Sequence, residues 1–190
     1  MGKDGKKFEV IKFATMLKAS PHMGTGTVTI KNDPRILPMG RFLRKTKMNE
    51  LPQLINVFKG DMSIIGPRPQ DQRCFDAFRE EDKAEILKVR PGLSGIGAVY
   101  FRDEENLMHK AQGDMIVFYD TVISPYKGRL EAWWVKNQSL KNYFLFIFLT
   151  VWVIVFSKST LLFQLRKDLP QPPHGLTEVE EQRGELGGVS

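Results

Sequence analysis

The residues Asn49-Glu-Leu-Pro-Gln-Leu-Ile-Asn-Val-Phe-Lys-Gly60 contain the most regular pattern in the chain. Asn49 suits the N-cap of a helix, Glu50 suits the positive end of the helix dipole, and Pro52 is tolerated in the first turn. Gly60 suits the residue that follows a helix, because glycine readily adopts a positive φ angle. Apolar side chains recur at the spacing of a single helical face: Leu51, Leu54, Ile55 and Phe58. The segment predicts an amphipathic helix with one apolar face.

Helices and short strands are predicted on both sides of this segment. The helices are expected at about 38–45, 71–88 and 114–123, with a further short helix that begins at residues 103–105. The strands are expected at Lys7–Phe13, Thr27–Ile30 and 98–101. The pair Asp4–Gly5 is a strong turn signal, and too few residues precede it to form a partner strand. We therefore expect an α+β fold, mostly α, with amphipathic helices and a small β-hairpin element whose first strand is missing.

A long apolar run occupies Tyr143–Phe156, fourteen residues without a charge. A membrane span needs about 20 such residues, so the run fits a segment lying in a membrane interface or a buried core helix better than a span. The flanking residues Trp133, Trp134, Lys136 and Lys141 favour the interface, because aromatic rings and long basic side chains lie at the headgroup level.

The charge of the chain favours anionic partners. The 190 residues carry a net charge of +6, and residues 1–50 contain eleven Lys and Arg against four acidic residues. Phosphates, nucleic acid and an acidic membrane surface all fit this charge. The single Cys74 excludes a disulfide within the chain and a zinc site of several cysteines. Residues 166–190 are rich in Pro and Gly and have few apolar residues, so we expect a catalytic domain at 1–165 and a mobile or disordered tail.

Few residues carry an obvious chemical motif. The sequence has no Walker loop, no dinucleotide-binding glycine pattern, no His-Glu-x-x-His and no Cys-x-x-Cys, and its three histidines (His22, His109 and His174) are far apart. What remains is the Asn49–Glu50 pair, with Arg44 before it and Arg68 between two prolines. A carboxylate can hold Mg²⁺ against phosphate oxygens, and arginine binds phosphate through two hydrogen bonds. The same residues also fit a purely structural reading as a helix cap, a dipole partner and solvated charges.

A longer stretch supports the functional reading. Residues Arg41–Pro69, which include Met-Asn-Glu-Leu-Pro-Gln-Leu and Ile-Ile-Gly-Pro-Arg-Pro, closely resemble the signature of the bacterial sugar transferases, the monotopic polyprenyl-phosphate phosphoglycosyl transferases. Further similar motifs are Lys12–Met16, Asn32–Arg35 and Arg90–Gly95, and the resemblance covers about residues 2–156. It implies transfer of a sugar 1-phosphate from a nucleotide-activated sugar, such as a UDP-sugar, to a membrane polyprenyl phosphate. A nucleoside monophosphate is released, Mg²⁺ is the cofactor, and the enzyme lies on the cytoplasmic face of the bacterial inner membrane.

The resemblance also assigns the site residues. Asn49 and Glu50 stand at the position of the catalytic pair, with Glu50 as the metal carboxylate. Arg44, Arg68 and Arg102 are then phosphate or nucleotide contacts. The family has Asp, which forms a covalent phosphosugar intermediate, where this chain has Asn49, and an amide is a far poorer nucleophile than a carboxylate.

Three outcomes remain open for this substitution. Another carboxylate serves (Glu50, Asp61 or Asp103), the acceptor phosphate attacks directly while Asn49 orients it, or the chain is inactive. The family also often has Arg at the position of Ala14, so we expect one phosphate contact to be lost. Family members carry an apolar membrane-inserting segment upstream of the first strand. Its absence from this sequence leaves two expectations open: a truncated chain, or a chain that reaches the bilayer through Tyr143–Phe156 and basic patches.

Two other classes of function compete with the transferase. A non-catalytic homologue would hold a lipid phosphate or a partner enzyme, and Asn49 is its best support. A nucleic-acid binder rests on the net charge alone and lacks the strand pattern of aromatic and basic residues typical of RNA-recognition sheets. No segment of the sequence identifies the sugar, the nucleotide base or the oligomeric state.

Overall fold

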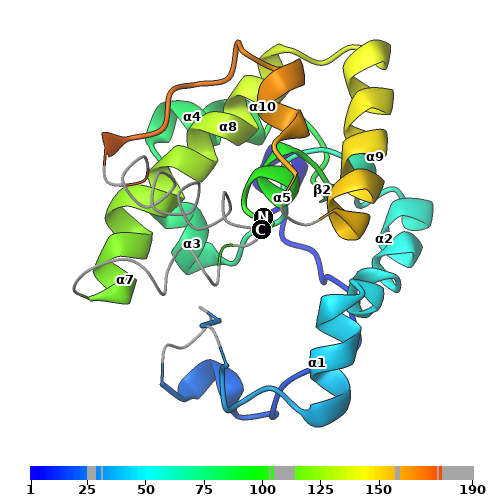
Figure 1. The fold of residues 1–190 in the computed structure, drawn as a ribbon, viewed down its shortest axis with the longest axis vertical. Helices are drawn as coiled ribbons and strands as arrows, with labels where there is room; N and C mark the ends of the chain where they lie inside the picture. The colour runs from blue at the N-terminus through cyan, green and yellow to red at the C-terminus, as the bar shows by residue number, and fades with distance from the viewer. Residues whose placement is uncertain are drawn as a thin grey trace, which may run out of the picture.

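The computed structural model describes residues 1–24, 29–30, 32–102, 104, 114–156, 159–174 and 176, and helices dominate it (Figure 1). The helices are α1 (Pro38–Lys45), α2 (Gln53–Lys59), α3 (Gln72–Asp76), α4 (Glu80–Ile86), α5 (Ile96–Tyr100), α7 (Met115–Phe118), α8 (Ser124–Lys136), α9 (Leu140–Val155) and α10 (Leu161–Leu165). Short 3-10 turns cover Lys3–Gly5, Ser20–His22 and Met48–Glu50, and a π-helical turn at Tyr119–Ile123 joins α7 to α8. The expected class, α+β and mostly α, is confirmed.

The sheet differs from the expected hairpin. Strands β1 (Ser63–Ile65) and β2 (Gly92–Ser94) run parallel, with Ser63 opposite Gly92 and Ile65 opposite Ser94. The strands predicted at Lys7–Phe13 and 98–101 are wrong. Half of the one predicted at Thr27–Ile30 lies outside the described residues, and the described half, residues 29–30, forms no strand. Residues 98–100 instead belong to α5.

A side chain explains why Lys7–Phe13 needs no partner strand. Asn56 on α2 accepts a hydrogen bond from the backbone N–H of Ile11 at 3.0 Å and donates one to the carbonyl oxygen of Glu9 at 2.8 Å. The backbone N–H of Phe13 donates to the carbonyl oxygen of Asn49 at 3.0 Å. These three backbone groups of the extended segment are therefore hydrogen-bonded without the inter-strand bonds of a β-sheet.

The main core lies between α5, α8 and α9. The rings of Trp134 and Phe146 meet edge to face with centroids 5.0 Å apart, and both side chains are buried. The Ser94 and Thr150 hydroxyls lie 2.8 Å apart and join β2 to α9. Helix α8 also packs against α4 on its other side. The small sheet is thereby fixed against α9, the longest helix of the described chain.

Helix α9 buries one apolar face and exposes another. Its buried side chains are Phe146, Leu149 and Val153, and its exposed apolar side chains include Leu140, Phe144, Phe148, Val151 and Val155. The Tyr143–Phe156 run is therefore a core helix that also presents apolar surface. Within the described residues, no helix is both long enough and apolar enough to cross a membrane.

Helix α2 exposes its apolar face and buries its polar face, which is the reverse of an ordinary surface helix. Its predicted apolar face (Leu51, Leu54, Ile55 and Phe58) is exposed, with Phe58 at 94%, whereas the polar Gln53 and Asn56 are buried. The helix starts at Gln53, later than predicted, because Asn49 belongs to a separate 3-10 turn and caps no helix with its side chain. It ends as predicted at Gly60, whose φ of 85° is left-handed.

Two other predicted helices have different bounds. The predicted helix 71–88 is divided into α3 and α4 by a break at Ala77–Arg79. The predicted helix 114–123 does not stop before Pro125, because the chain continues through the π-helical turn Tyr119–Ile123 into α8, whose first turn contains this proline. Helix α1 matches its predicted range.

The beginning of the expected C-terminal tail contacts the core. Leu176 is fully buried, and the Tyr126 hydroxyl donates a 2.8 Å hydrogen bond to the carbonyl oxygen of Pro170. Residues 175 and 177–190, and most of the predicted 103–105 helix, lie outside the described residues. A mobile tail in 177–190 stays a prediction.

The two faces of α9 give a stability test. Phe146→Ala should lower the free energy of unfolding by about 3–5 kcal/mol, because it leaves a cavity in the core. Phe144→Ala, on the exposed face of the same helix, should change it by less than about 1 kcal/mol. Urea denaturation of both variants checks this, and equal losses would contradict the assignment of the two faces.

Candidate active site

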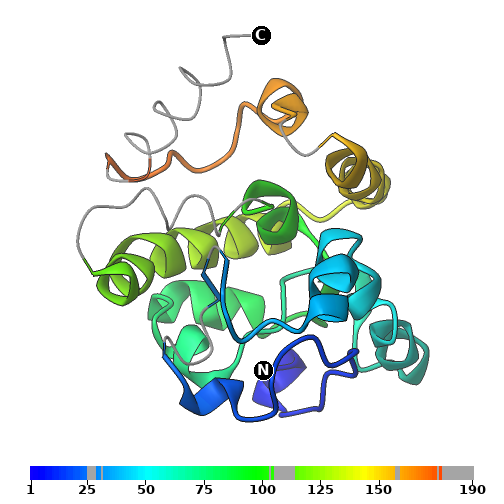
Figure 2. The ribbon, with the colours of Figure 1, turned by 60° about the horizontal axis from the view of Figure 1, so that its bottom comes forward.

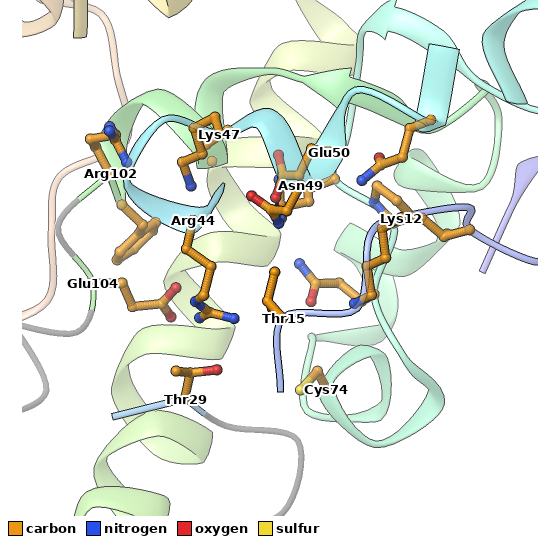
Figure 3. Close-up of a pocket in the computed structure, with 18 of the residues that line it drawn as sticks. Lys12, Thr15, Thr29, Arg44, Lys47, Asn49, Glu50, Cys74, Arg102 and Glu104 are labelled. Carbon is orange, nitrogen blue, oxygen red and sulfur yellow. Dashed lines mark hydrogen bonds and ion pairs between the residues drawn. The ribbon is translucent and has the colours of Figure 1, made fainter. Parts of the chain in front are cut away.

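A large cavity of about 1170 Å³ lies between the N-terminal third on one side and the loop after β1, α5 and α8 on the other (Figure 3). All five residues that the sequence singles out line it: Arg44, Asn49, Glu50, Arg68 and Arg102. Its wall also carries the basic side chains of Lys12, Arg41, Lys45, Lys47 and Lys127, against a smaller number of acids. The cavity is therefore suited to an anionic ligand.

Glu50 is delivered by a tight turn. Lys47 adopts a left-handed backbone with φ of 59°, and the N–H of Glu50 donates to the Lys47 carbonyl oxygen at 3.1 Å. Figure 3 shows Asn49 and Glu50 next to each other in the cavity wall, with Arg44 and Lys47 to one side and Lys12 to the other. The turn therefore places one carboxylate and one amide among several cations.

Arg68 reaches Glu50 from the loop after β1. Its Nη2 donates to Glu50 Oε1 at 2.5 Å, and its Nη1 lies 3.4 Å from Oε2. Two backbone hydrogen bonds attach the loop to strand β2. The N–H of Gly66 donates to the carbonyl oxygen of Ser94 at 2.9 Å, and the N–H of Gly92 donates to the carbonyl oxygen of Pro67 at 2.7 Å. A Cβ at Gly92 would lie 2.2 Å from the Gly66 nitrogen, so only glycine allows this approach. The short parallel sheet thus positions the site arginine.

At Glu50, burial and the neighbouring positive charges shift the pKa in opposite directions. Burial by itself would raise the pKa of Glu50, but the charge and hydrogen bond of Arg68, together with Lys47 and Lys12, lower the pKa below its ordinary value. Burial lowers the pKa of Lys47, and Glu50 partly offsets this. Glu50 is therefore a carboxylate at neutral pH.

Three buried polar atoms in the cavity wall have no hydrogen-bond partner among the described residues. They are Asn49 Oδ1, Arg102 Nε and Glu131 Oε2. Such atoms are costly inside a protein unless something binds them. A ligand that accepts from Arg102 and donates to or coordinates Asn49 would satisfy two of them.

The structure separates the candidate carboxylates. Glu50 lines the cavity, whereas Asp61 does not line it and lies 3.4 Å from the Asn56 amide. Asp103 lies outside the described residues. In the described part of the chain, no cluster of three or more His, Cys, Asp or Glu residues could hold a metal ion. Any metal here would need other oxygen donors beside Glu50.

The Asn32–Arg35 motif has a structural role. Arg35 is buried and binds Asp33 with both ends of its guanidinium, at 2.9 and 2.6 Å. It also donates to the carbonyl oxygens of Ser20 and Met23. The hydrogen bond from Arg35 lowers the pKa of Asp33 to about 2. The motif fixes one wall of the cavity and does not offer a free arginine.

Sequence reasoning missed a polar cluster on α8. Lys127 is buried, donates to Glu104 Oε1 at 2.6 Å and to the Tyr119 hydroxyl at 3.3 Å, and lies over the rings of Phe101 and Tyr119. Glu131, one turn later, is also buried and accepts from the backbone N–H of Arg68 at 3.2 Å. A Lys–Glu pair at i,i+4 is typical of an exposed helix face, so this spacing does not indicate that both residues face the cavity.

Comparison with known proteins places this geometry in context. Residues 1–157 match the family described as bacterial sugar transferase. The UDP-galactose-lipid carrier transferase of Erwinia amylovora is 32% identical over 169 residues, which cover 82% of this chain and 32% of that protein. The undecaprenyl-phosphate galactose phosphotransferase of Salmonella typhimurium is 33% identical with the same coverage.

A shorter match is found in Escherichia coli. Its UDP-glucose:undecaprenyl-phosphate glucose-1-phosphate transferase is 39% identical over 114 residues, covering 58% of this chain and 24% of that protein. The chain thus spans about a third or less of the length of these relatives. Because the family match covers most of the chain and contains every cavity residue named above, this chain belongs to the bacterial sugar transferase family.

Proposed function

We propose that this chain transfers a sugar 1-phosphate from a UDP-sugar to a polyprenyl phosphate at a membrane surface, releasing UMP. The observation that carries the proposal is the convergence of Glu50, Arg68 and Arg102 on one cavity rich in cations. The names of the relatives describe transferases that act on undecaprenyl phosphate or a lipid carrier, which supports the same reaction class here. The identity of the sugar is left to the experiment below.

The cations suit a diphosphate. Arg68 is about one third exposed in its side chain, so its guanidinium reaches the cavity while it holds Glu50. The buried Nε of Arg102 is a donor without a partner among the described residues. Arginine forms short, charge-assisted bonds to phosphate oxygens. In the proposal these two residues, together with Arg44, bind the phosphates of the donor.

The oxygen atoms beside them suit Mg²⁺. Asn49 is 8% exposed, and its unpartnered Oδ1 and the neighbouring Glu50 carboxylate are the kind of oxygen ligands that this ion prefers. We propose that Glu50 holds Mg²⁺ with help from Asn49. When bound, the ion would neutralise part of the charge on the donor phosphates.

The neutral Asn49 favours direct transfer over a covalent enzyme intermediate. Both oxygens of Glu50 are engaged by Arg68, and Asp61 lies outside the cavity, so neither of these two candidate carboxylates is a free nucleophile. In the proposed step an oxygen of the polyprenyl phosphate attacks the sugar-bearing phosphorus. The bond from that phosphorus to the bridging oxygen breaks, and UMP leaves with the electron pair. The Asn49 amide would orient the attacking phosphate.

The apolar faces of α2 and α9 support a membrane location. Both helices pack against the small sheet, and Figures 1 and 2 show them on the same side of the molecule. Their exposed residues follow helical spacing: Leu51, Leu54, Ile55 and Phe58 on one, and Phe144, Phe148, Val151 and Val155 on the other. We propose that this side lies in the cytoplasmic leaflet of a bacterial inner membrane, as a peripheral or monotopic contact. The water-insoluble acceptor would then reach the cavity from the bilayer.

A second candidate function follows from Asn49 alone. If an amide at this position prevents turnover, the chain would bind a lipid phosphate or a partner enzyme without catalysis. The same cations serve this function, so only a measurement of turnover separates the two.

The ion pair at the site gives a pH test. Arg68→Met should raise the pKa of Glu50 above its ordinary value of 4.5, because burial then acts without its main counter-charge. In the wild type the lowered pKa stabilises the fold above the ordinary pKa of Glu50, and this contribution is lost as pH falls through the lowered value. Titration of the Glu50 carboxyl by ¹³C NMR measures the change. Arg73→Met, which breaks the exposed pair with Asp120, should leave the Glu50 pKa unaltered.

Turnover tests the proposed reaction. The full chain, incubated with a panel of UDP-sugars, polyprenyl phosphate and Mg²⁺, should release UMP. Glu50→Ala should reduce the rate by at least about a hundredfold, because it removes the metal carboxylate and leaves Arg68 unpaired. The matched change Glu81→Ala, at an exposed position on α4, should leave the rate unchanged. Absence of UMP with every sugar, while lipid binding persists, would select the non-catalytic function.

The kinetic pattern of the same reaction tests direct transfer. Initial rates with both substrates varied should show that both bind before UMP leaves, and no phosphosugar adduct should form on the wild-type chain. Asn49→Asp should permit trapping of such an adduct. An adduct on the wild-type chain would contradict direct transfer.

Vesicle binding tests the membrane surface. Phe58→Ser should weaken binding to anionic vesicles by about tenfold, because a fully exposed aromatic side chain contributes about 1.5–3 kcal/mol when it leaves water. Val117→Ser, an exposed apolar position on α7 away from α2 and α9, serves as the control. Equal weakening by the two changes would rule out the proposed face.

A further inference from the structure

Glu131 on α8 is a buried carboxyl group that the proposed reaction does not yet use. Its exposed fraction is 2%. Oε1 accepts a hydrogen bond from the backbone N–H of Arg68 at 3.2 Å, and Oε2 is buried without a partner among the described residues. The residue lines the cavity and touches the loop that carries its main arginine.

The nearby cations are paired with other acids. Lys127, one turn earlier on α8, donates to Glu104 and to the Tyr119 hydroxyl. The guanidinium of Arg68 binds Glu50, and only its backbone reaches Glu131. No ion pair to Glu131 is formed within the described residues. A buried carboxylate without an ion pair is costly, and such a group tends to take up a proton.

The contacts on Oε1 show what the side chain holds in place. The N–H of Arg68 lies at the centre of the loop between β1 and α3. Gly97, in the first turn of α5, packs so closely that a Cβ there would lie 2.3 Å from Oε1. Glu131 therefore joins the arginine loop to α5, and a shift of its carboxyl group would move the backbone of Arg68.

We propose that Glu131 is a positioning residue that is uncharged in the active protein, holds the backbone of Arg68 for phosphate binding, and weakens the binding of the nucleotide sugar when it ionises. The inference rests on the proposed function, because it concerns the donor site of that reaction. An added negative charge beside Arg68, in a site of low dielectric constant, opposes an anionic ligand.

The titration of the group agrees with this geometry. Burial raises the pKa of Glu131 to about 7, although the backbone N–H groups of Arg68 and Gly97 and the charges of Lys127 and Arg68 partly offset it. The other charged groups around the site are Glu104 beside Lys127 and Glu50 beside Arg68. Ionisation of Glu131 therefore falls near neutral pH, where it can change ligand affinity.

Calorimetry at two pH values tests the proposal with UDP-galactose and UDP-glucose. Both phosphates of these probes are esterified, so their charge is constant over the range used. If only the protonated form of Glu131 binds, wild-type affinity should fall about tenfold between pH 6 and pH 8. Glu131→Gln keeps a carbonyl acceptor and cannot ionise, so its affinity should stay within about twofold of the pH 6 wild type at both pH values.

Two further variants separate positioning from general effects. Glu131→Ala loses the acceptor and should bind weakly at both pH values. Glu81→Gln makes the same chemical change at an exposed position on α4 and should keep the wild-type pH profile. If Glu131 acted as a charged partner of Lys127 or Arg68, Glu131→Gln would be as damaging as Glu131→Ala.

A second measurement needs no ligand. A ¹³C carboxyl resonance that is absent from Glu131→Gln should titrate near neutral pH in the wild-type chain. A titration near the ordinary glutamate pKa, or nucleotide-sugar affinity that is independent of pH, would overturn the inference alone. Absence of nucleotide-sugar binding by the wild type at either pH would instead overturn the proposed function, and the inference with it.

Discussion

The ion pair between Arg68 and Glu50 is the contact on which the arrangement of the cavity depends. Arg68 comes from the loop after β1, and Glu50 comes from the turn before α2, so the pair joins two walls across the cavity. The Arg68 side chain is 34% exposed, and ion pairs of that exposure add little to stability once water screens them. Its main consequence is local: it keeps a carboxylate ionised and an arginine oriented where a phosphate can reach both.

The same turn ties the cavity to the apolar surface. Glu50 lies three positions before the first residue of α2, and the exposed apolar residues of this segment start at Leu51. The helix buries Gln53 and Asn56, and Asn56 anchors the extended N-terminal segment. Polar residues therefore face inward and apolar residues outward, because the inner face must bind backbone groups of Lys7–Phe13. A membrane contact through α2 would hold the Asn49–Glu50 turn close to the bilayer surface.

The sequence predicted the elements whose pattern is local and failed where the partner is distant. The range of α1, the end of α2 at Gly60 and the grouping of Arg44, Asn49, Glu50, Arg68 and Arg102 could be predicted, since local spacing or the family resemblance determines them. The strand at Lys7–Phe13 could not be excluded, because Asn56, far along the chain, supplies its hydrogen bonds. The strands β1 and β2 have only three residues each, too few for a period of two to be visible.

The sequence also could not show which charged residues are buried. Glu131 and Lys127 look like solvated helix residues in the sequence, and only the packing of α5 and α8 turns them toward the cavity. The orientation of α2 was likewise hidden, since a periodic pattern shows that a helix has an apolar face and not what that face meets.

Asn49 changes the charge of the site as well as its chemistry. An amide adds no negative charge beside Glu50, so the surrounding cations act on fewer fixed anions and bind the phosphates of a donor more strongly. Direct transfer requires that donor and acceptor phosphate occupy the cavity together, since no covalent intermediate stores the sugar phosphate between two half-reactions. A volume of about 1170 Å³ exceeds the usual range for one small ligand, about 300–1,000 Å³. Under the proposed function, the amide at position 49 and the size of the cavity would therefore agree with one mechanism, in which both substrates are bound before any bond breaks.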